Sequence, residues 1–77
     1  MANRKAFVLI LTEMGQIVNV LNTIHGKKGI EEVDVIMGPY DIIATLSGAD
    51  TNEIANIVVN SIHSVAGIKH TVTLMAV

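Results

Sequence analysis

The sequence predicts one small domain of the α+β class, with elements in the order strand, helix, strand, strand, helix, strand. Runs of aliphatic and β-branched residues alternate with two segments in which apolar residues recur every three or four positions. The first pattern is typical of strands and the second of amphipathic helices. A Gly38-Pro39 turn separates the two central strands, and the whole pattern occurs twice along the chain.

An internal repeat sets the topology. Corresponding segments lie 38 residues apart, as Asn22 does from Asn60: Asn22-Thr23-Ile24-His25 and Asn60-Ser61-Ile62-His63, Gly29-Ile30 and Gly67-Ile68, Met37 and Met75. The chain is therefore a strand-helix-strand unit written twice. Two such units interleave into a four-stranded antiparallel sheet with two helices on one face, the ferredoxin-like βαββαβ arrangement. Right-handed crossovers within each unit fix the strand order.

The first unit follows a polar leader, Met1 to Arg4, and opens with a strand from Lys5 to Thr12 that is apolar on both faces. We expect a strand of this kind to be buried on both sides. The spacing then predicts a helix that begins at Thr12 or Glu13 and ends at Gly26. Its apolar stripe contains Met14, Ile17, Val18, Leu21 and Ile24.

The two central strands form a hairpin. The second strand is predicted over Ile30 to Met37 and the third over Asp41 to Ser47. Proline presets the backbone for a tight turn, and the residue before it is pushed out of the helical region. Tyr40 and Asp41 are therefore displayed at the hairpin tip, and loops on rigid scaffolds are where binding residues tend to lie.

The second unit closes the fold. Asp50 is a good N-cap, and Glu53 three residues later has the spacing of a capping box. The second helix ends at Gly67, and the last strand is predicted over Ile68 to Val77. The predicted apolar stripe of this helix contains Ile54, Ile57, Val58, Ser61, Ile62 and Val65.

Size and composition predict self-association. A chain of 77 residues buries only about 60% of its unfolded surface and is marginal alone. It has no cysteine for disulfides or thiolate metal sites, and 51% of its residues are hydrophobic. The sheet face away from the helices is too apolar to remain wet, so we expect at least a dimer through that face or edge. That face is expected to carry Ile43, Thr45, Thr71, Thr73 and Met75, or the residues that alternate with them.

Several partner classes are disfavoured. The longest unbroken apolar run is Ala6 to Leu11, far short of the ~20 residues of a membrane span. Without a signal-peptide pattern, a cytoplasmic location without membrane contact is expected. The net charge is −2 and the five basic residues are scattered, whereas a nucleic-acid binder usually shows a basic patch. Direct binding of DNA or RNA is therefore not expected.

The sequence does not predict an enzyme. Ser47, Ser61 and Ser64 lack flanking nucleophile signatures, and there is no glycine-rich phosphate loop. No cofactor is expected. His25 and His63 occupy matching places at the ends of two antiparallel helices, so they lie too far apart to share a metal. Favourable placement at a helix C-terminus explains them better, and no metal site is predicted.

Asp41 has two interpretations. It is either a turn carboxylate that bonds to neighbouring backbone, or a counter-ion for the ammonium group of a small ligand. Composition alone slightly favours the first.

A resemblance to a known family favours the ligand-binding interpretation of Asp41. The segment Met37-Gly38-Pro39-Tyr40-Asp41-Ile42-Ile43 resembles the hairpin of the effector-binding (RAM) domain of the Lrp/AsnC transcriptional regulators. The segment Gly67-Ile68-Lys69-His70-Thr71-Val72-Thr73 is similar to the closing segment of that domain, which has two threonines at alternate positions. The similarity extends from Ala6 to Met75. Typical family members also carry an N-terminal DNA-binding helix-turn-helix, whereas this chain starts at the first strand.

The resemblance implies a single stand-alone effector domain over residues 1–77, without a helix-turn-helix. It implies a homodimer, often assembled into an octamer, that holds amino-acid-type effectors between dimers near the hairpin. Any transcriptional action would be indirect, through co-assembly with full-length Lrp/AsnC-type regulators.

The hairpin offers the ligand-binding groups that such an effector requires. The N–H groups of Gly38, Tyr40 and Asp41 are expected to hold a ligand carboxylate, since Pro39 has no N–H. Asp41 would pair with the ligand ammonium and Tyr40 would form a pocket wall. Hydroxyls of Thr71 and Thr73 would come from the same or a neighbouring subunit.

Three alternatives belong to other classes. An ACT-like amino-acid-binding module shares the doubled unit but usually binds near a glycine after the first strand, for which Gly15 is the candidate. A small dimeric monooxygenase-type enzyme would normally bury more aromatic residues than the two present here. The third alternative is a purely structural oligomerisation domain. Ligand binding separates the first two from the third, and turnover identifies an enzyme.

Overall fold

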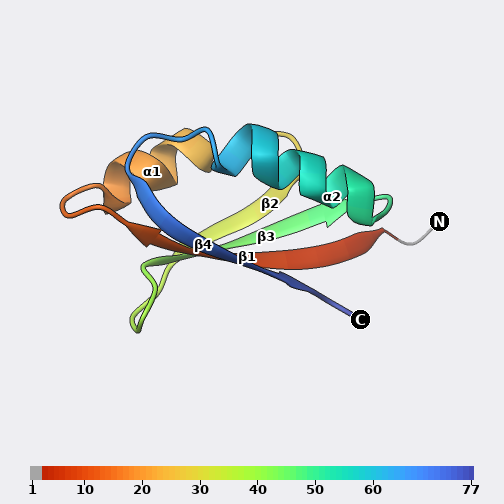
Figure 1. Cartoon of the computed structure of the whole chain (residues 1–77), viewed down its shortest axis with the longest axis horizontal. Coiled ribbons are helices and arrows are strands. Elements are labelled where there is room, and N and C mark those ends of the chain that lie inside the picture. The colour runs from red at the N-terminus through yellow and green to blue at the C-terminus, as the bar shows by residue number, and fades with distance from the viewer. Residues whose placement is uncertain (1–2) are drawn as a thin grey trace.

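The computed structural model describes residues 3–77 and confirms the predicted order and fold (Figure 1). The first two residues of the predicted leader lie outside the described part. The elements are β1 (Arg4–Thr12), α1 (Ile17–Ile24), β2 (Ile30–Val35), β3 (Ile42–Gly48), α2 (Thr51–Ile57), its π-helical continuation η1 (Val58–Ile62), and β4 (Ile68–Met75). The strand order is β2-β3-β1-β4, all neighbours are antiparallel, and both helical segments cover one face.

The hydrophobic core lies between the sheet and the helices. Every second residue of β1 and β3 is buried, because successive side chains of a strand point to opposite faces. The core residues from the sheet are Ala6, Val8, Ile10, Ile30, Ile42, Ala44 and Leu46, and those from the helical segments and the residues after them are Val20, Ile24, Ile54, Val58, Ile62 and Val65.

The other sheet face, here called the open face, is uncovered in the single chain. Cross-strand partners share a face, and Leu9 pairs with both Ile43 of β3 and Val72 of β4. The strand β1 is thus buried by the chain itself on the helix side only. The predicted Ile43 and Thr45 lie on the open face, but Thr71, Thr73 and Met75 do not, because they pair with the buried Ile10, Val8 and Ala6. Their alternates occupy the open face instead: His70, Val72 and Leu74.

Helix α1 starts later than predicted. Gly15 has φ +78°, which is outside the helical region and breaks the pattern, so the helix begins at Ile17. Met14, expected in the apolar stripe, lies in the preceding turn and is 98% exposed. Val18 was also wrongly assigned to the stripe, since it is 66% exposed while Val20 is fully buried. The face toward the core is formed by Val20 and Ile24, with Ile17 and Leu21 partly buried beside them.

The second helix is capped as predicted at Asp50. Its carboxylate Oδ1 accepts the N–H of Glu53 at 2.8 Å. The Glu53 carboxylate accepts the N–H of Ala49 at 3.1 Å, one residue before the cap. The predicted stripe is confirmed, with Ile57 and Ser61 only partly buried. The helix changes to π geometry at Val58, which the sequence pattern did not predict.

Candidate functional site

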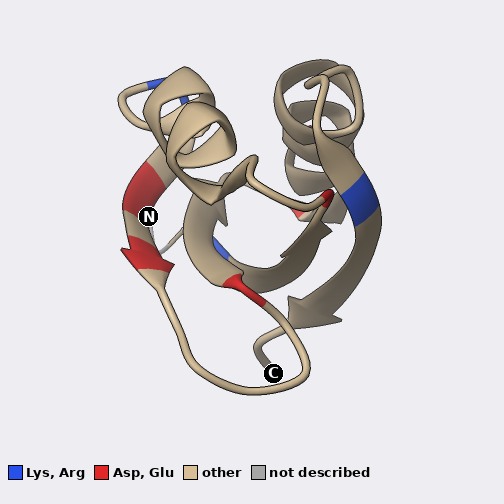
Figure 2. Cartoon of the chain, turned by 90° about the vertical axis from the view of Figure 1, so that its left-hand side faces the viewer, with Lys and Arg blue, Asp and Glu red and all other residues tan. Residues whose placement is uncertain are grey.

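The hairpin loop between β2 and β3 extends from the end of the sheet, on the side opposite the helices (Figures 1 and 2). Two backbone hydrogen bonds anchor it. The N–H of Ile36 donates to the carbonyl of Asp41 at 2.8 Å, and the N–H of Asp41 donates to the carbonyl of Ile10 at 2.9 Å. The exposed tip, Met37 to Pro39, is therefore carried on a base fixed to β1.

Asp41 forms a tie between the loop and the end of β1. Its Oδ2 atom accepts both the backbone N–H and the hydroxyl of Thr12, each at 2.9 Å. Thr12 is 8% exposed, and the two residues are 29 apart in sequence. The interpretation of Asp41 as a turn residue predicted a hydrogen bond to the backbone next to it in sequence. The observed partner, Thr12, is distant in sequence. The second oxygen, Oδ1, is the part of this carboxylate left for a further partner.

Tyr40 stacks on His70 of β4. The ring centroids are 6.2 Å apart and the ring planes differ by 27°. Offset stacking of aromatic rings at such distances is favourable. His70 lies on the open face opposite Leu11. The stack therefore connects the hairpin to the far edge of the sheet, across the end of β1.

The predicted N–H donors are only partly free. That of Asp41 is occupied by the carbonyl of Ile10. Those of Gly38 and Tyr40 have no backbone partner among residues 3–77. The tip therefore offers two of the three expected donors, beside a proline that has none.

Thr71 and Thr73 are not brought together with the hairpin tip. They point to the helix side of β4, whereas His70 between Lys69 and Thr71 points to the open face. The Thr71 hydroxyl lies 3.2 Å from Nε2 of His63, and Thr73 is exposed. Within one chain the predicted ligand-binding residues are thus split between two faces of the sheet.

Thr12 and His70 are neighbours of the hairpin that sequence reasoning missed. Thr12 was interpreted as the end of the first strand or the start of the first helix, and no contact was predicted for His70. The signal that could have found them is topological, since the end of β1 and the start of β4 meet the β2–β3 turn at one end of this fold.

Charge is distributed unevenly between the sheet edges. Figure 2 shows acidic segments on β2 at one edge and a basic segment on β4 at the other. The residues are Glu31, Glu32 and Asp34 on β2 and Lys69 on β4.

The histidines at the helix ends lie where predicted. His25 is the C-cap of α1 and His63 is the C-cap of η1. In residues 3–77 no group of three or more His, Cys, Asp or Glu is placed to hold a metal ion. Over the same residues, no helix has the length and apolarity needed to cross a bilayer.

Comparison with known proteins points to one family. A family model, the Lrp/AsnC ligand binding domain, matches residues 5–77. The protein TTHA0845 from Thermus thermophilus is 31% identical, with a TM-score of 0.91 over 96% of this chain and 92% of that one. No curated protein matches the chain significantly.

Two more distant structures share the fold. AsnC from E. coli is 17% identical, with a TM-score of 0.89 over 96% of this chain and 50% of that chain. The transcriptional regulator NMB0573 from Neisseria meningitidis, solved as an L-Met complex, is 12% identical with a TM-score of 0.83. This chain covers 49% of that protein, so it corresponds to about half of each regulator.

Proposed function

Because the chain belongs to the Lrp/AsnC ligand-binding domain family, we propose that it binds an amino-acid-type effector at the hairpin and acts without catalysis. The observation that carries this proposal is the hairpin base, where Asp41 keeps one carboxylate oxygen beyond its Thr12 contacts. The L-Met complex of NMB0573 supports the ligand class.

Each end of an amino acid finds a matching group at this site. The ligand ammonium would bond to Oδ1 of Asp41, and a charge-assisted bond of this type is stronger than a neutral one. The ligand carboxylate would accept hydrogen bonds from the N–H groups of Gly38 and Tyr40. The Tyr40 ring, fixed by its stack on His70, would form a wall for the ligand side chain.

The site is incomplete in one chain. The hairpin tip is exposed, and the hairpin residues line neither of the two cavities described for residues 3–77. Small-ligand sites usually enclose most of the ligand surface. A neighbouring subunit would supply the missing walls, and Thr71 and Thr73, if they contribute, would come from that neighbour.

The open face would supply the first subunit contact. Its central residues Leu9, Ile43 and Val72 are only partly buried in the single chain, and Leu74 is 48% exposed. Burial of apolar area is the dominant favourable contribution to most protein association. We therefore include in the proposal a homodimer through this face, with further assembly bringing hairpins of different dimers together.

The regulatory output would be indirect. A chain with a net charge of −2 and acidic β2 residues does not attract the DNA backbone. The proposed action is co-assembly with full-length Lrp/AsnC-type regulators, in which the effector alters the stability of the shared assembly.

A thermal-shift screen of the twenty amino acids tests the proposal. A ligand that binds only the folded state stabilises it by about 2.7 kcal/mol at a hundredfold excess over its Kd. For a domain of this size that corresponds to a Tm increase of about 10 °C or more. If none of the twenty raises the Tm at millimolar concentration, the amino-acid assignment is wrong.

A further inference from the structure

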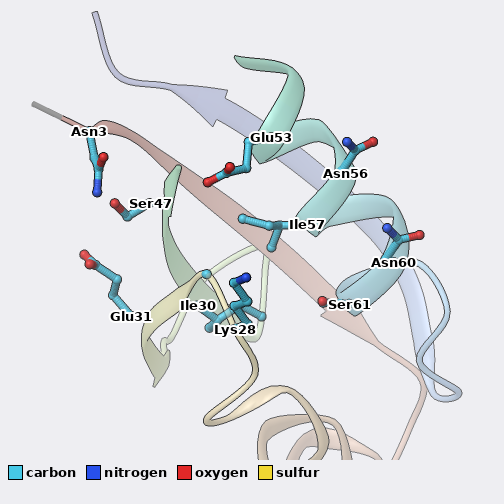
Figure 3. A pocket seen from close by; sticks show the side chains of 11 residues that line it. Asn3, Lys28, Ile30, Glu31, Ser47, Glu53, Asn56, Ile57, Asn60 and Ser61 are labelled. Atoms are coloured by element: carbon cyan, nitrogen blue, oxygen red, sulfur yellow. The ribbon is translucent and has the colours of Figure 1, made fainter. Parts of the chain in front are cut away.

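A cavity of about 510 Å³ lies at the end of the sheet opposite the hairpin. Its walls come from the start of β2, the end of β3 and the α2–η1 helix, with Asn3 at one rim (Figure 3). Pockets for small ligands have volumes of roughly 300–1,000 Å³. Unlike the hairpin, this cavity is formed within a single chain.

Two departures from regular structure meet at this cavity. The register between β2 and β3 shifts between Ile30 and Glu32, which leaves Glu31 as the extra residue and directs it to the cavity. On the opposite wall, Asn60 and Ser61 belong to the π-helical segment η1. Bulges and π-helical turns are both over-represented beside functional sites, because they re-aim side chains at a cost in regularity.

Matching glycines bring a loop against each helix. Gly29 has φ +87°, and a Cβ there would overlap Cδ1 of Ile57, so the loop passes directly against the helix that forms one wall of the cavity. Its counterpart in the repeat, Gly67, packs in the same way against Gln16 and Val20 of the other helical segment. The cavity is lined by both halves of the repeat, with Glu31 from the first and Ser47 from the second.

The charges in the cavity are arranged in two groups. In Figure 3 the carboxylates of Glu31 and Glu53 point to the same side as Ser47 and Asn3. The Lys28 side chain lies across from them, near the apolar side chain of Ile57. Two carboxylates and one ammonium give these walls a net negative charge.

We propose that this cavity is a second ligand site, independent of the hairpin, for a basic amino acid or a compound of the same chemistry. The ligand's side-chain ammonium would lie between Glu31, Glu53 and the Ser47 hydroxyl. Its aliphatic stem would pass along Ile57, and its carboxylate would face Lys28. A ligand with one net positive charge balances the charge of the walls, and the acceptor-rich end selects an ammonium group.

The test is a titration of the isotope-labelled protein with L-lysine, followed residue by residue through amide NMR signals. L-Norleucine, which has the same carbon skeleton without the terminal ammonium, is the matched ligand control. We expect saturable shifts at Gly29, Ser47, Ile57 and Ser61 with lysine only. No saturable shift at about 10 mM lysine, a concentration that occupies even a millimolar site, would overturn the proposal.

Matched variants keep the test specific. Glu31→Gln should weaken lysine binding about three- to tenfold, as expected for loss of one partly solvated charge partner. Glu31→Lys should abolish binding. The neighbouring Glu32→Gln, on a residue paired with Thr45 and outside the cavity lining, should leave it unchanged.

The outcomes separate this site from the hairpin. Equal lysine affinity in Glu31→Lys and the natural sequence would refute the site, as would equal binding of norleucine. Shifts confined to Gly38 to Asp41 would also refute it while supporting the proposed effector site. Shifts in the cavity without any at the hairpin would support the second site alone.

Discussion

The two ends of the sheet differ in whether a single chain encloses a space for a ligand. At the hairpin end, polar groups extend from the chain, and Asp41 and Tyr40 already have partners in Thr12 and His70. At the other end, polar groups surround a cavity that one chain forms by itself. Ligand binding at the hairpin should therefore depend on assembly, whereas binding in the cavity should not. The following experiments test that contrast, beginning with the variant that should change it most.

A charge on the open face should produce the largest difference between ligand binding at the hairpin and ligand binding in the cavity. Leu74→Asp places a carboxylate on a residue that is 48% exposed in the single chain, so folding should survive. Burial of that charge in a dimer should raise the dimer Kd at least about a hundredfold, from a cost of roughly 3 kcal/mol. Sedimentation velocity measures the dimer Kd. Effector binding at the hairpin should fall with it, while cavity binding persists.

Val59→Asp is the control for this variant. Val59 is 56% exposed, similar to Leu74, but lies in η1 on the helix side. It should leave the oligomeric state unchanged. Equal loss of association in both variants would mean that the open face is not the specific contact.

Asp41→Asn should remove the effector but not the fold. The amide oxygen can still accept from Thr12, whereas the charge that would pair with the ligand ammonium is lost. We expect effector binding to weaken by roughly 2–5 kcal/mol, measured as the loss of ligand-induced Tm increase. Asp34→Asn, an exposed acidic residue of β2, is the charge-matched control. Undiminished binding by Asp41→Asn would leave Asp41 with the structural role alone.

Two glycine variants compare close packing with backbone conformation. Gly26→Ala and Gly29→Ala both place a side chain at positive φ, +84° and +87°. At Gly26 nothing lies within 4 Å of the new Cβ, so only the conformational cost of about 1–2 kcal/mol applies. At Gly29 the clash with Ile57 should add roughly 1–3 kcal/mol. Urea unfolding measures both, and equal losses would show that Ile57 moves aside without cost.

The last and smallest effect concerns DNA. The protein alone should not retard DNA in a gel at physiological salt, because its charge is −2 and its basic residues are scattered. A retarded complex that contains this chain only when a full-length family member is added would support co-assembly. Specific retardation by the chain alone would contradict the proposed indirect action.

Local patterns predicted the fold well. The apolar runs of β1 and β3, the capping residues at Asp50 and the strand-helix-strand unit written twice each depend on neighbours in sequence, and all are confirmed as elements of the fold. The expectation that β1 is buried on both sides is met within the chain on the helix side only. The start of α1 was wrong because periodicity alone included Met14, although Gly15 adopts a positive φ. Positive φ at a glycine is permitted by sequence but is not required by it.

The site was only partly predictable. The hairpin residues were found because their turn chemistry is local. The Asp41–Thr12 tie and the Tyr40–His70 stack join segments about 30 residues apart, which no local pattern reports. Thr71 and Thr73 were placed on the wrong face of the sheet. The register of β4 against β1 determines which face each side chain occupies, and a shift of one residue moves every side chain to the other face. The bulge at Glu31 was missed for the same reason.

The hydrogen bond between Thr12 and Asp41 makes the Thr12 amide a probe of motion in the hairpin loop. The Thr12 amide hydrogen is held by a side chain of the hairpin rather than by another strand. Its exchange with solvent deuterium therefore requires only that Asp41 swing away, and not that the sheet open. The exchange rate at this single amide, divided by the rate of an unprotected amide, gives the fraction of time that the Asp41 side chain is away from Thr12.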